Sequence, residues 1–194
     1  MVSPGLDAGR AGSPEAATLE HRPEHEASAP LVRAAAAGDE GRWRELWTGY
    51  LEFYEVELPD QVTDMTWQRM MDPRSGVVGR VALLDDHVVG FAVAVIHPTT
   101  WSVAGTCYLE DLFVDPVARR RGIGRSLIED LLDVAQDRDC SRLYWHTQST
   151  NPARGLYDEF VAADDFVRYR LLVQPAGPTS QGADRLQRDV KKQP

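Results

Sequence analysis

The sequence predicts a mixed α/β fold in one domain. Short apolar runs typical of strands are interspersed with segments in which apolar residues recur every third or fourth position, as in helices. The resulting order is strand, two helices, three strands, helix, strand, helix, strand. Three strands in direct succession exclude the regular strand and helix alternation of a doubly wound fold. All aromatic residues lie between residues 31 and 173, which delimits the domain.

The two ends of the chain differ from this domain in composition. Residues 1–30 contain prolines, glycines, alanines and acids but no aromatic residue, and residues 174–194 have the same character. Such segments bury too little apolar surface to offset the entropy lost on ordering. We therefore expect a disordered N-terminal extension over residues 1–30, a folded domain over residues 31–173 and a flexible C-terminal tail over residues 174–194.

The first part of the domain is predicted to contain one strand and two helices. Residues 31–37 form a short apolar run that indicates a strand. Residues 40–56 predict an amphipathic helix, because large apolar side chains recur at helical spacing. These side chains are Trp43, Leu46, Trp47, Tyr50, Leu51 and Tyr54. Pro59 ends this helix, and Thr63 or Asp64 could cap a second helix that runs to Met71.

The remaining elements follow from the same patterns. Residues 77–84 and 88–96 are apolar runs separated by a short polar turn, which predicts a β-hairpin. A third strand is expected at residues 107–114, followed by a basic loop and a helix over residues 122–138 with one apolar stripe. A strand at residues 142–147, a helix at residues 152–161 and a strand at residues 166–173 complete the domain.

The composition excludes several classes of protein. The 194 residues carry a formal net charge of −9, which opposes binding to nucleic acid and favours small cationic partners. No run approaches the roughly 20 apolar residues of a membrane span, and the first residues lack a secretory signal. Cys107 and Cys140 form neither a CxxC pair nor a His/Cys cluster, so no metal site is expected. We expect a cytoplasmic protein that binds neither nucleic acid nor membranes.

The most informative segment is the loop Arg119-Arg120-Arg121-Gly122-Ile123-Gly124-Arg125 between a predicted strand and a predicted helix. The free N–H groups and the dipole of a helix N-terminus favour a phosphate, and glycines let the backbone approach the ligand closely. The loop is not a dinucleotide fingerprint, because Leu127 occupies the third glycine position, and no GK[ST] follows as in a P-loop. A solvated basic turn that starts a helix is the alternative.

Two further segments lie on either side of this loop. Tyr108-Leu109-Glu110-Asp111-Leu112-Phe113-Val114 precedes it, and Asn151-Pro152-Ala153-Arg154-Gly155-Leu156-Tyr157 follows about 30 residues later. Together with Arg119-x-x-Gly122-x-Gly124, these segments resemble the GNAT superfamily of N-acetyltransferases, and within it the polyamine and histone-type branch. The resemblance covers nearly all of residues 31–173.

This resemblance implies a GNAT-like fold and a cosubstrate. The implied fold is a central, mostly antiparallel sheet that is splayed at the acetyl-CoA site and flanked by helices. The pyrophosphate of acetyl-CoA would rest on the basic loop, and its pantetheine arm would pair with the end of the preceding strand. The implied acetyl-CoA-binding residues are Leu112, Phe113, Val114, Arg119, Arg120, Arg121, Gly122, Ile123, Gly124, Arg125 and Asn151. The chain has one residue fewer than is usual in the family between Asn151 and Tyr157, which leaves the contact of Asn151 with CoA open.

The resemblance also implies two catalytic residues. Tyr157 matches a tyrosine that lies beside the cofactor sulfur, which implies a general acid for the leaving thiolate. Glu110 matches a glutamate near the amine, which implies a general base and an ammonium ligand. Because neighbouring residues of a strand face opposite sides, we expect only Glu110 to face the substrate and Asp111 to be a structural partner. A solvated or ion-paired strand residue is the alternative for Glu110.

Further candidates could bind the acceptor. Tyr54 and Glu55 lie among acidic and aromatic residues at the end of the first predicted helix, where ion pairing and cation–π contact could hold an ammonium group. Trp101 could cover the acceptor. A solvated helix face and simple packing are the alternatives for these three residues. His97 and His146 titrate near neutrality, but lone histidines on strands are more often structural.

These observations predict an N-acetyltransferase that moves acetyl from acetyl-CoA to a primary amine by direct transfer in a ternary complex. The expected acceptor is a small cationic amine, such as a polyamine or a lysine-like molecule. The alternatives are a protein lysine or N-terminal acetyltransferase, and a CoA-binding regulatory module without catalysis, which the short loop at Asn151 would favour. The resemblance further implies a homodimer, with residues 166–173 as a place for subunit pairing.

Overall fold

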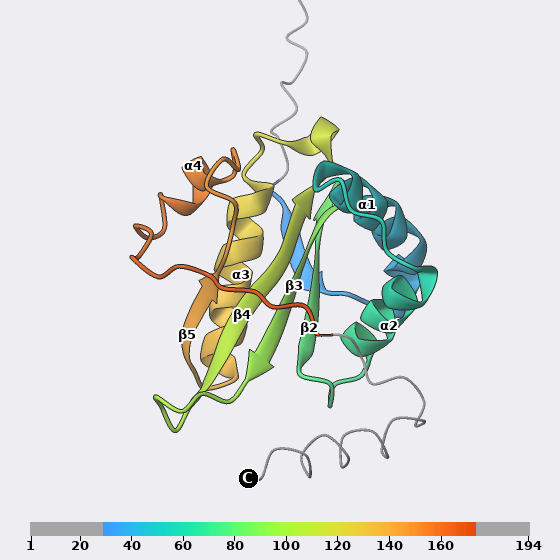
Figure 1. The fold of residues 1–194 in the computed structure, drawn as a ribbon. Coiled ribbons are helices and arrows are strands. Elements are labelled where there is room, and N and C mark those ends of the chain that lie inside the picture. Colours follow the sequence, from blue (N-terminus) through green and yellow to red (C-terminus); the bar gives the residue numbers. More distant parts are fainter. Residues whose placement is uncertain (1–28, 174–194) are drawn as a thin grey trace, which may run out of the picture. The chain divides into compact units, whose positions relative to one another are not determined.

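Five strands form one sheet in the order β1-β2-β3-β4-β5 (Figure 1). The computed structural model describes residues 29–173, and these residues fall into two compact parts, 29–151 and 152–173. The strands, all in the first part, are β1 Leu31–Ala34, β2 Val77–Leu84, β3 His87–His97, β4 Gly105–Val114 and β5 Cys140–Trp145. The expected mixed α/β class is confirmed. The extension and the tail expected at the ends lie outside the described residues, apart from residues 29 and 30.

All neighbouring strands are antiparallel except β4 and β5, which are parallel. The predicted hairpin is formed by β2 and β3, with Leu84 opposite His87. Its turn residues Asp85 and Asp86 have φ values of 50° and 63°, a left-handed conformation that aspartate tolerates better than most residues. The sheet is therefore mostly antiparallel, with one parallel pair where α3 returns the chain.

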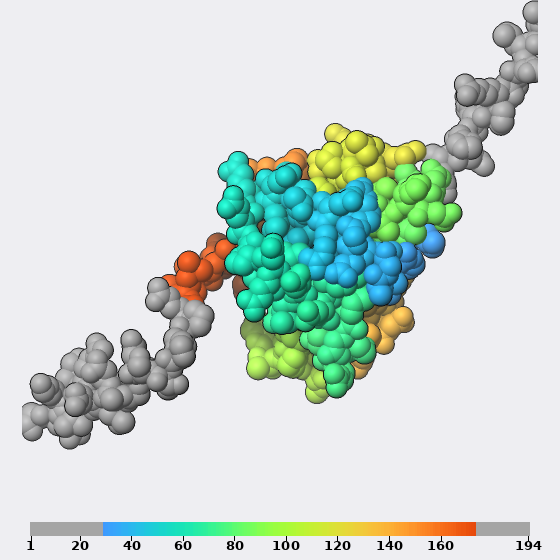
Figure 2. All heavy atoms as spheres, turned by 90° about the vertical axis from the view of Figure 1, so that its right-hand side faces the viewer, coloured from blue at the N-terminus to red at the C-terminus, as the bar shows by residue number. Residues whose placement is uncertain are grey.

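Two helices cover one face of the sheet and a third covers the other. The helices α1 Glu40–Phe53 and α2 Asp60–Met71 form the blue-to-green surface that faces the viewer in Figure 2. The core on their side is a cluster that includes Trp43, Leu46, Trp47, Trp67, Val81, Phe91, Val93 and Phe113. Trp43 lies at its centre with 0% exposure, because α1 places three of its aromatic side chains along one stripe.

The helix α3 Ile123–Asp137 packs on the opposite face. Its buried residues are Ile123, Leu127, Ile128, Leu131 and Ala135, which recur at the predicted helical spacing. Small residues of the central strands, such as Ala92 and Ala94, are fully buried and let the helix approach the sheet. Both carboxylate oxygens of Asp130 on α3 accept hydrogen bonds of 2.6 Å from the guanidinium of Arg80 on β2.

Some element boundaries differ from the predicted ones. The first strand ends at Ala34 rather than residue 37, because the Asp39 carboxylate accepts hydrogen bonds from the Ala36 amide and from Arg33. These bonds draw the chain into a 3-10 turn, Ala37–Asp39. The helix α2 begins at Asp60 rather than at Thr63 or Asp64, since Pro59 presets the backbone at its N-terminus. The last strand of the sheet is Cys140–Trp145, two residues earlier than expected at each end.

The described residues of the smaller part form one short helix, α4 Arg154–Tyr157. The predicted helix over residues 152–161 is thus much shorter, and the predicted strand at residues 166–173 is wrong, because these residues adopt no regular structure. An apolar run forms a strand only when a second backbone pairs with it. Between residues 152 and 173 the structure contains no other strand that could do so. The expected place for subunit pairing is therefore not a strand.

Among residues 29–173, no helix is long and apolar enough to cross a membrane.

Candidate active site

The end of β4 has one edge that is not covered by its neighbouring strand. β4 pairs with β3 up to its last residue, Val114, but its pairing with β5 ends where Leu109 lies opposite Trp145. From Glu110 to Val114, the backbone groups that point towards β5 therefore have no ladder partner in that strand. An extended ligand with amide groups could pair with this edge. The splayed sheet that the sequence predicts is present at this point.

The loop after β4 is tied to α1 and β3. Asp115 caps the 3-10 turn Pro116–Ala118 by accepting a hydrogen bond of 3.1 Å from the Val117 amide. The guanidinium of Arg42 on α1 donates to the other oxygen of Asp115 and, through Nε, to the Val88 carbonyl oxygen at 3.0 Å. These contacts fix the direction in which the chain leaves β4. The basic loop and the N-terminus of α3 follow from there.

The N-terminus of α3 has the features of an anion site. Gly122 starts the helix in the left-handed region with a φ of 78°, and Arg120 has a φ of 64°. No side chain caps this end of α3, and no acidic residue lies in its first turn. The first N–H groups of a helix have no partner within the helix, and the dipole adds positive potential there. The loop therefore suits an anionic group such as a diphosphate.

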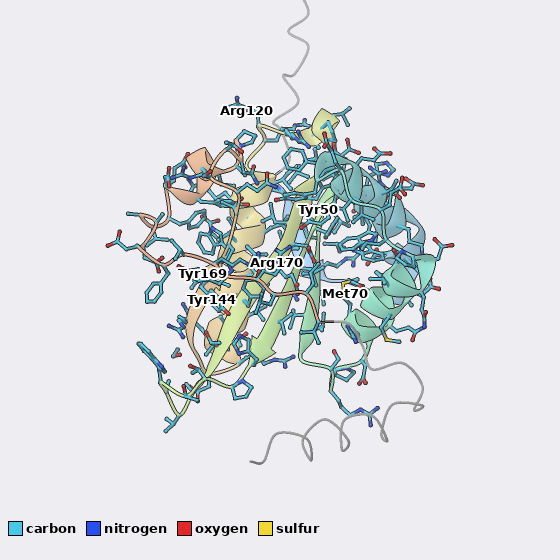
Figure 3. The ribbon with its side chains drawn as sticks, viewed as in Figure 1. Tyr50, Met70, Arg120, Tyr144, Tyr169 and Arg170 are labelled. Carbon is cyan, nitrogen blue, oxygen red and sulfur yellow. The ribbon has the colours of Figure 1, made fainter. Side chains whose placement is uncertain are left out.

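The predicted acetyl-CoA-binding residues contribute in different ways. The side chains of Phe113 and Ile123 are buried, with 7% and 2% exposure, so only their backbone groups are available to a ligand. Arg119 turns back to the protein, with Nε 3.1 Å from the Val114 carbonyl oxygen. Its guanidinium carbon also lies 5.6 Å from the centre of the Phe113 ring. Arg120 and Arg121 are exposed, and Figure 3 shows Arg120 at the tip of the loop.

The remaining predicted acetyl-CoA-binding residues lie close to this loop or across the site from it. Leu112 and Val114 are partly buried on the free edge of β4, and Gly124 is partly buried in the first turn of α3. Arg125 is 3.7 Å from Glu129. Asn151 is buried, and its side-chain amide donates to Tyr54 Oη at 3.2 Å and to Thr147 Oγ1 at 2.8 Å. The amide of Asn151 thus supports Tyr54 at the end of α1.

A β-bulge in β4 decides where the two neighbouring carboxylates lie. Val93 of β3 lies opposite Asp111 and Ala94 lies opposite Leu109, so Glu110 has no opposite residue. In a bulge two residues face one, and the strict alternation of side chains is lost. The expectation that Glu110 and Asp111 face opposite sides is therefore wrong. The Asp111 carboxyl lies next to the Tyr50 hydroxyl of α1, each of these groups shifts the pKa of the other, and the charge of Glu110 raises the pKa of both.

The surroundings of Asp111 change its acidity. The pKa of the Asp111 carboxyl is raised to about 6, mainly by burial; the Tyr50 hydroxyl opposes this rise and the negative charge of Glu110 adds to it. Burial likewise raises the pKa of Tyr50, and the Asp111 charge adds to this effect. Asp111 is partly buried, whereas Glu110 is exposed.

Aromatic rings of α1 line the side of the site next to these carboxylates. The Tyr50 ring stacks on Trp47 with 5.3 Å between centroids and meets the Tyr54 ring edge-on at 5.0 Å. Figure 3 shows Tyr50 between α1 and the sheet. The sequence indicated Tyr54 as an acceptor-binding residue. It placed Tyr50 only in the aromatic rim around Tyr54 and not among the acceptor-binding residues, because a tyrosine on the apolar stripe of a helix has the same pattern as a core residue.

Two other predicted acceptor-binding residues lie elsewhere. Glu55 follows α1 with a φ of 54° and is exposed. Trp101 is 84% exposed in the loop before Gly105, at the end of β4 opposite to the bulge. The histidines join a separate ring cluster with Tyr108 and Tyr144, in which His97 Nε2 is 3.2 Å from Tyr144 Oη. Tyr157 is the last residue of α4, in the smaller part, and is partly buried.

Comparison with known proteins identifies the family. The model of the acetyltransferase (GNAT) family matches residues 43–160, which include the bulge, the basic loop and Tyr157. The chain belongs to the GNAT acetyltransferase family. The resemblance predicted from the three sequence motifs is confirmed, and the protein is an acyltransferase of the N-acetyltransferase type.

Among individual GNAT proteins, a D-amino-acid N-acetyltransferase of Saccharomyces cerevisiae is 33% identical over 72% of this chain and 89% of its own length. An aminoglycoside N(6')-acetyltransferase of Klebsiella aerogenes is 31% identical over 65% of this chain and 84% of its own. The crystal structure of a ribosomal-protein-alanine N-acetyltransferase from Brucella melitensis superposes with a TM-score of 0.64 at 22% identity. The superposition covers 75% of this chain and 100% of the Brucella chain, and it shows that the two share the GNAT fold.

Proposed function

We propose that this GNAT protein transfers the acetyl group of acetyl-CoA to the primary amine of a small cationic molecule. The observation that carries this proposal is the bulge of β4, which holds two carboxylates beside the tyrosines of α1. The same strand ends at Val114, and the uncapped N-terminus of α3, which suits a diphosphate, follows at Gly122. One strand therefore connects an ammonium-binding group with an anion-binding loop.

The acetyl-CoA side of the site uses mainly backbone groups. The amides at the start of α3, with Arg120 and Arg121 nearby, would bind the diphosphate, and Gly122 and Gly124 would allow it to approach. The free edge of β4 from Leu112 to Val114 would hold the extended arm. When bound, acetyl-CoA supplies an activated acetyl group as a thioester.

The acceptor side uses charge and aromatic faces. An amine that is protonated in water must lose a proton before its nitrogen can act as a nucleophile. The Glu110 side chain is exposed, so its carboxylate would bind the ammonium group and take this proton directly or through a water molecule. The faces of Tyr50 and Tyr54 would add cation–π contacts. Tyr157, as the family motif implies, would donate a proton to the departing sulfur.

The class of acceptor follows from charge. Two carboxylates at one bulge and a net charge of −9 favour a molecule with more than one positive charge. Polyamines and lysine-like amines meet this requirement. The names of two relatives, a D-amino-acid and an aminoglycoside acetyltransferase, also refer to small molecules with amino groups.

The test is acetyl-CoA-dependent thiol release by the purified protein with separate acceptors. The acceptors are spermidine, spermine, L-lysine, D-lysine, an aminoglycoside and a lysine-containing peptide. We expect release with one class of small cationic amine and much slower release with the peptide. Fast release with the peptide alone would point to a protein acetyltransferase. No release with any acceptor, despite saturable CoA binding, would overturn the proposal in favour of a regulatory module.

A pair of variants connects this activity to the site. We expect Glu110→Gln to lower kcat by about 100-fold or more, in the range found for loss of a general base. Asp133→Asn makes the same change of charge at an exposed position of α3 and should leave kcat unchanged. Equal activity of both variants would remove Glu110 from the reaction.

A further inference from the structure

We propose that Asp111 is a second acceptor-binding carboxylate, which holds the substrate ammonium together with Glu110 and must be ionised for the acceptor to bind. This inference rests on the proposed function and deepens it. It gives Asp111 a role in binding alone, and the proton of the amine still leaves through Glu110. The sequence indicated only a structural role for Asp111, because strand alternation would turn it away from the substrate.

The bulge is the first part of the argument. Glu110 has no opposite residue in β3, so the side chains of Glu110 and Asp111 are not separated by the sheet. Each one acts electrostatically on Tyr50, and Glu110 also acts on Asp111. A primary ammonium group has three N–H donors, so it can donate to both carboxylates at once. Two acceptors at one bulge therefore match one primary ammonium.

Tyr50 is the second part of the argument. Its ring is held on three sides by Trp47, Phe91 and Phe113, at centroid distances of 5.3, 6.0 and 6.3 Å. Its hydroxyl lies next to the Asp111 carboxyl and lowers the pKa of that group. A carboxylate has lone pairs on both oxygens, so a hydroxyl beside it leaves acceptors for another donor. Tyr50 is thus a positioning residue for Asp111, and Asn151 in turn holds the neighbouring Tyr54.

The groups that surround Asp111 make its charge sensitive to pH. In the larger part of the chain, the titratable groups that face it are Tyr50 from α1 and Glu110 from its own strand, while Tyr54 acts on Tyr50. From β3 the opposite residue is Val93, which does not titrate. Burial places the pKa of Asp111 at about 6, so the carboxyl becomes protonated below that pH. A protonated Asp111 offers one acceptor fewer and no charge to an ammonium group.

The experiment measures kcat/KM for the acceptor between pH 5 and pH 9, at saturating acetyl-CoA. In the wild type, we expect kcat/KM to fall as the pH drops below about 6, and we call this fall the acid limb. The ionisation of the amine also changes kcat/KM, but it does so equally in all variants. Tyr50→Phe removes the hydroxyl that lowers the pKa of Asp111, so the limb should move to higher pH. Glu110→Gln removes the like charge that raises it, so the limb of the residual activity should move to lower pH.

Asp111→Asn completes the series. It should abolish this limb and raise KM for the acceptor by about tenfold or more, while KM for acetyl-CoA stays within about twofold. Tyr144→Phe removes a tyrosine hydroxyl that bonds with His97 instead, and should leave the limb in place. Because asparagine has nearly the size of aspartate, circular dichroism is expected to show the same fold.

The outcomes separate this inference from the proposed function. If the protein acetylates no amine, the proposed function fails first. If it acetylates an amine but Tyr50→Phe and Glu110→Gln shift the limb in the same direction or not at all, Asp111 is a structural residue and this inference alone is overturned. An Asp111→Asn variant with unchanged KM for the acceptor would overturn it equally, even if the pH limb moved.

Discussion

Gly122 is the residue on which the shape of the anion site depends most directly. Its φ of 78° is strained for any residue with a Cβ atom, although a methyl group would meet no atom within 4 Å. We expect Gly122→Ala to lower stability by about 1 kcal/mol through backbone strain and to raise KM for acetyl-CoA several-fold. Initial-rate kinetics with each substrate varied in turn would show this. A methyl group at position 38 would also meet no atom within 4 Å, and Gly38 has no positive φ, so Gly38→Ala should change neither the stability nor KM for acetyl-CoA.

At the scale of single residues, the sequence predicts the loop better than the bulge. Arginines and glycines before an apolar stripe are enough to indicate a phosphate site at a helix N-terminus, and residues 119–125 form such a loop. Nothing in the residue types of β4 indicates that Glu110 lacks an opposite residue. A bulge arises from the pairing of two strands, and a one-residue change in register reverses every later side chain. The role of Asp111 therefore became visible only in the structure.

Between elements, the contact of α3 with β2 depends on one ion pair. The side chains of Arg80 and Asp130 are only 17% and 18% exposed and make two hydrogen bonds. Removing one partner leaves the other charge poorly solvated, so we expect Asp130→Ala to lower the free energy of unfolding by about 3 kcal/mol. Urea unfolding would measure it. Arg74→Ala breaks an exposed pair with Asp72 and should leave the free energy of unfolding nearly unchanged. Similar losses in both variants would contradict this account.

The distance between α1 and β4 depends on Gly49. A Cβ atom at this position would lie 3.0 Å from Cζ of Phe113, which is buried between the helix and the strand. We expect Gly49→Ala to push α1 outwards, to cost about 1–3 kcal/mol and to weaken acceptor binding, because Tyr50 moves with the helix.

Gly41→Ala is the matched control on the same helix. It meets no atom within 4 Å, so its better helix propensity should stabilise the protein by about 0.5–1 kcal/mol. Thermal unfolding of both variants, with KM for the acceptor, would test the pair. The changes in unfolding temperature of the two variants need not be equal in size. A Gly49→Ala variant that is as stable as the wild type and has a normal KM would show that α1 tolerates the methyl group.

At the scale of elements, periodicity predicts what a segment can form but not what it will pair with. The apolar stripe of α3 and the hairpin of β2 and β3 were predicted from local patterns, because each contains its own period or turn. Residues 166–173 have a strand-like composition as well, yet they adopt no regular structure. A strand needs a partner backbone, and the residues of a single segment carry no information about that partner.

For the molecule as a whole, Asp111 relates activity to stability. Its pKa in the folded protein, about 6, is higher than the value of 3.8 for a free aspartate, so the folded state binds the proton more tightly. Below about pH 4, Asp111 is protonated in both the folded and the unfolded state and does not lower the free energy of unfolding. As the pH rises from about 4 to about 6, ionisation of Asp111 in the unfolded state lowers the free energy of unfolding. At about 1.4 kcal/mol per pKa unit, the loss above pH 6 is at most about 3 kcal/mol.

We therefore expect Asp111→Asn to recover the stability that ionisation of Asp111 removes in the wild type. The variant should unfold at a higher temperature than the wild type at pH 8 and at nearly the same temperature at pH 4, while it loses acceptor binding. Scanning calorimetry at the two pH values would measure this difference. A variant that is less stable than the wild type at pH 8 would show that the charge of Asp111 stabilises the fold. It would then be wrong that Asp111 lowers stability in exchange for acceptor binding.

The class of the whole fold was predictable because it depends on the order of elements and on local motifs, and both can be recognised in the amino-acid sequence. The strand segment from Tyr108 to Val114, the basic loop and the later segment from Asn151 to Tyr157 were sufficient to indicate the GNAT family, which the family model confirms over residues 43–160. The acceptor side was harder to predict. It is assembled from α1, the bulge and Asn151, which are far apart in sequence and meet only through the register of the sheet.

The end of the pairing between β4 and β5 has a consequence for amide hydrogen exchange. Between Glu110 and Val114, alternate amides point towards a neighbour that is no longer there, whereas those on the other side are held by β3. The first set should exchange with deuterium rapidly in the free protein, although it lies in the middle of a sheet. Acetyl-CoA bound along this edge would slow their exchange, so deuterium uptake would report occupancy of the site even in a variant that no longer turns over.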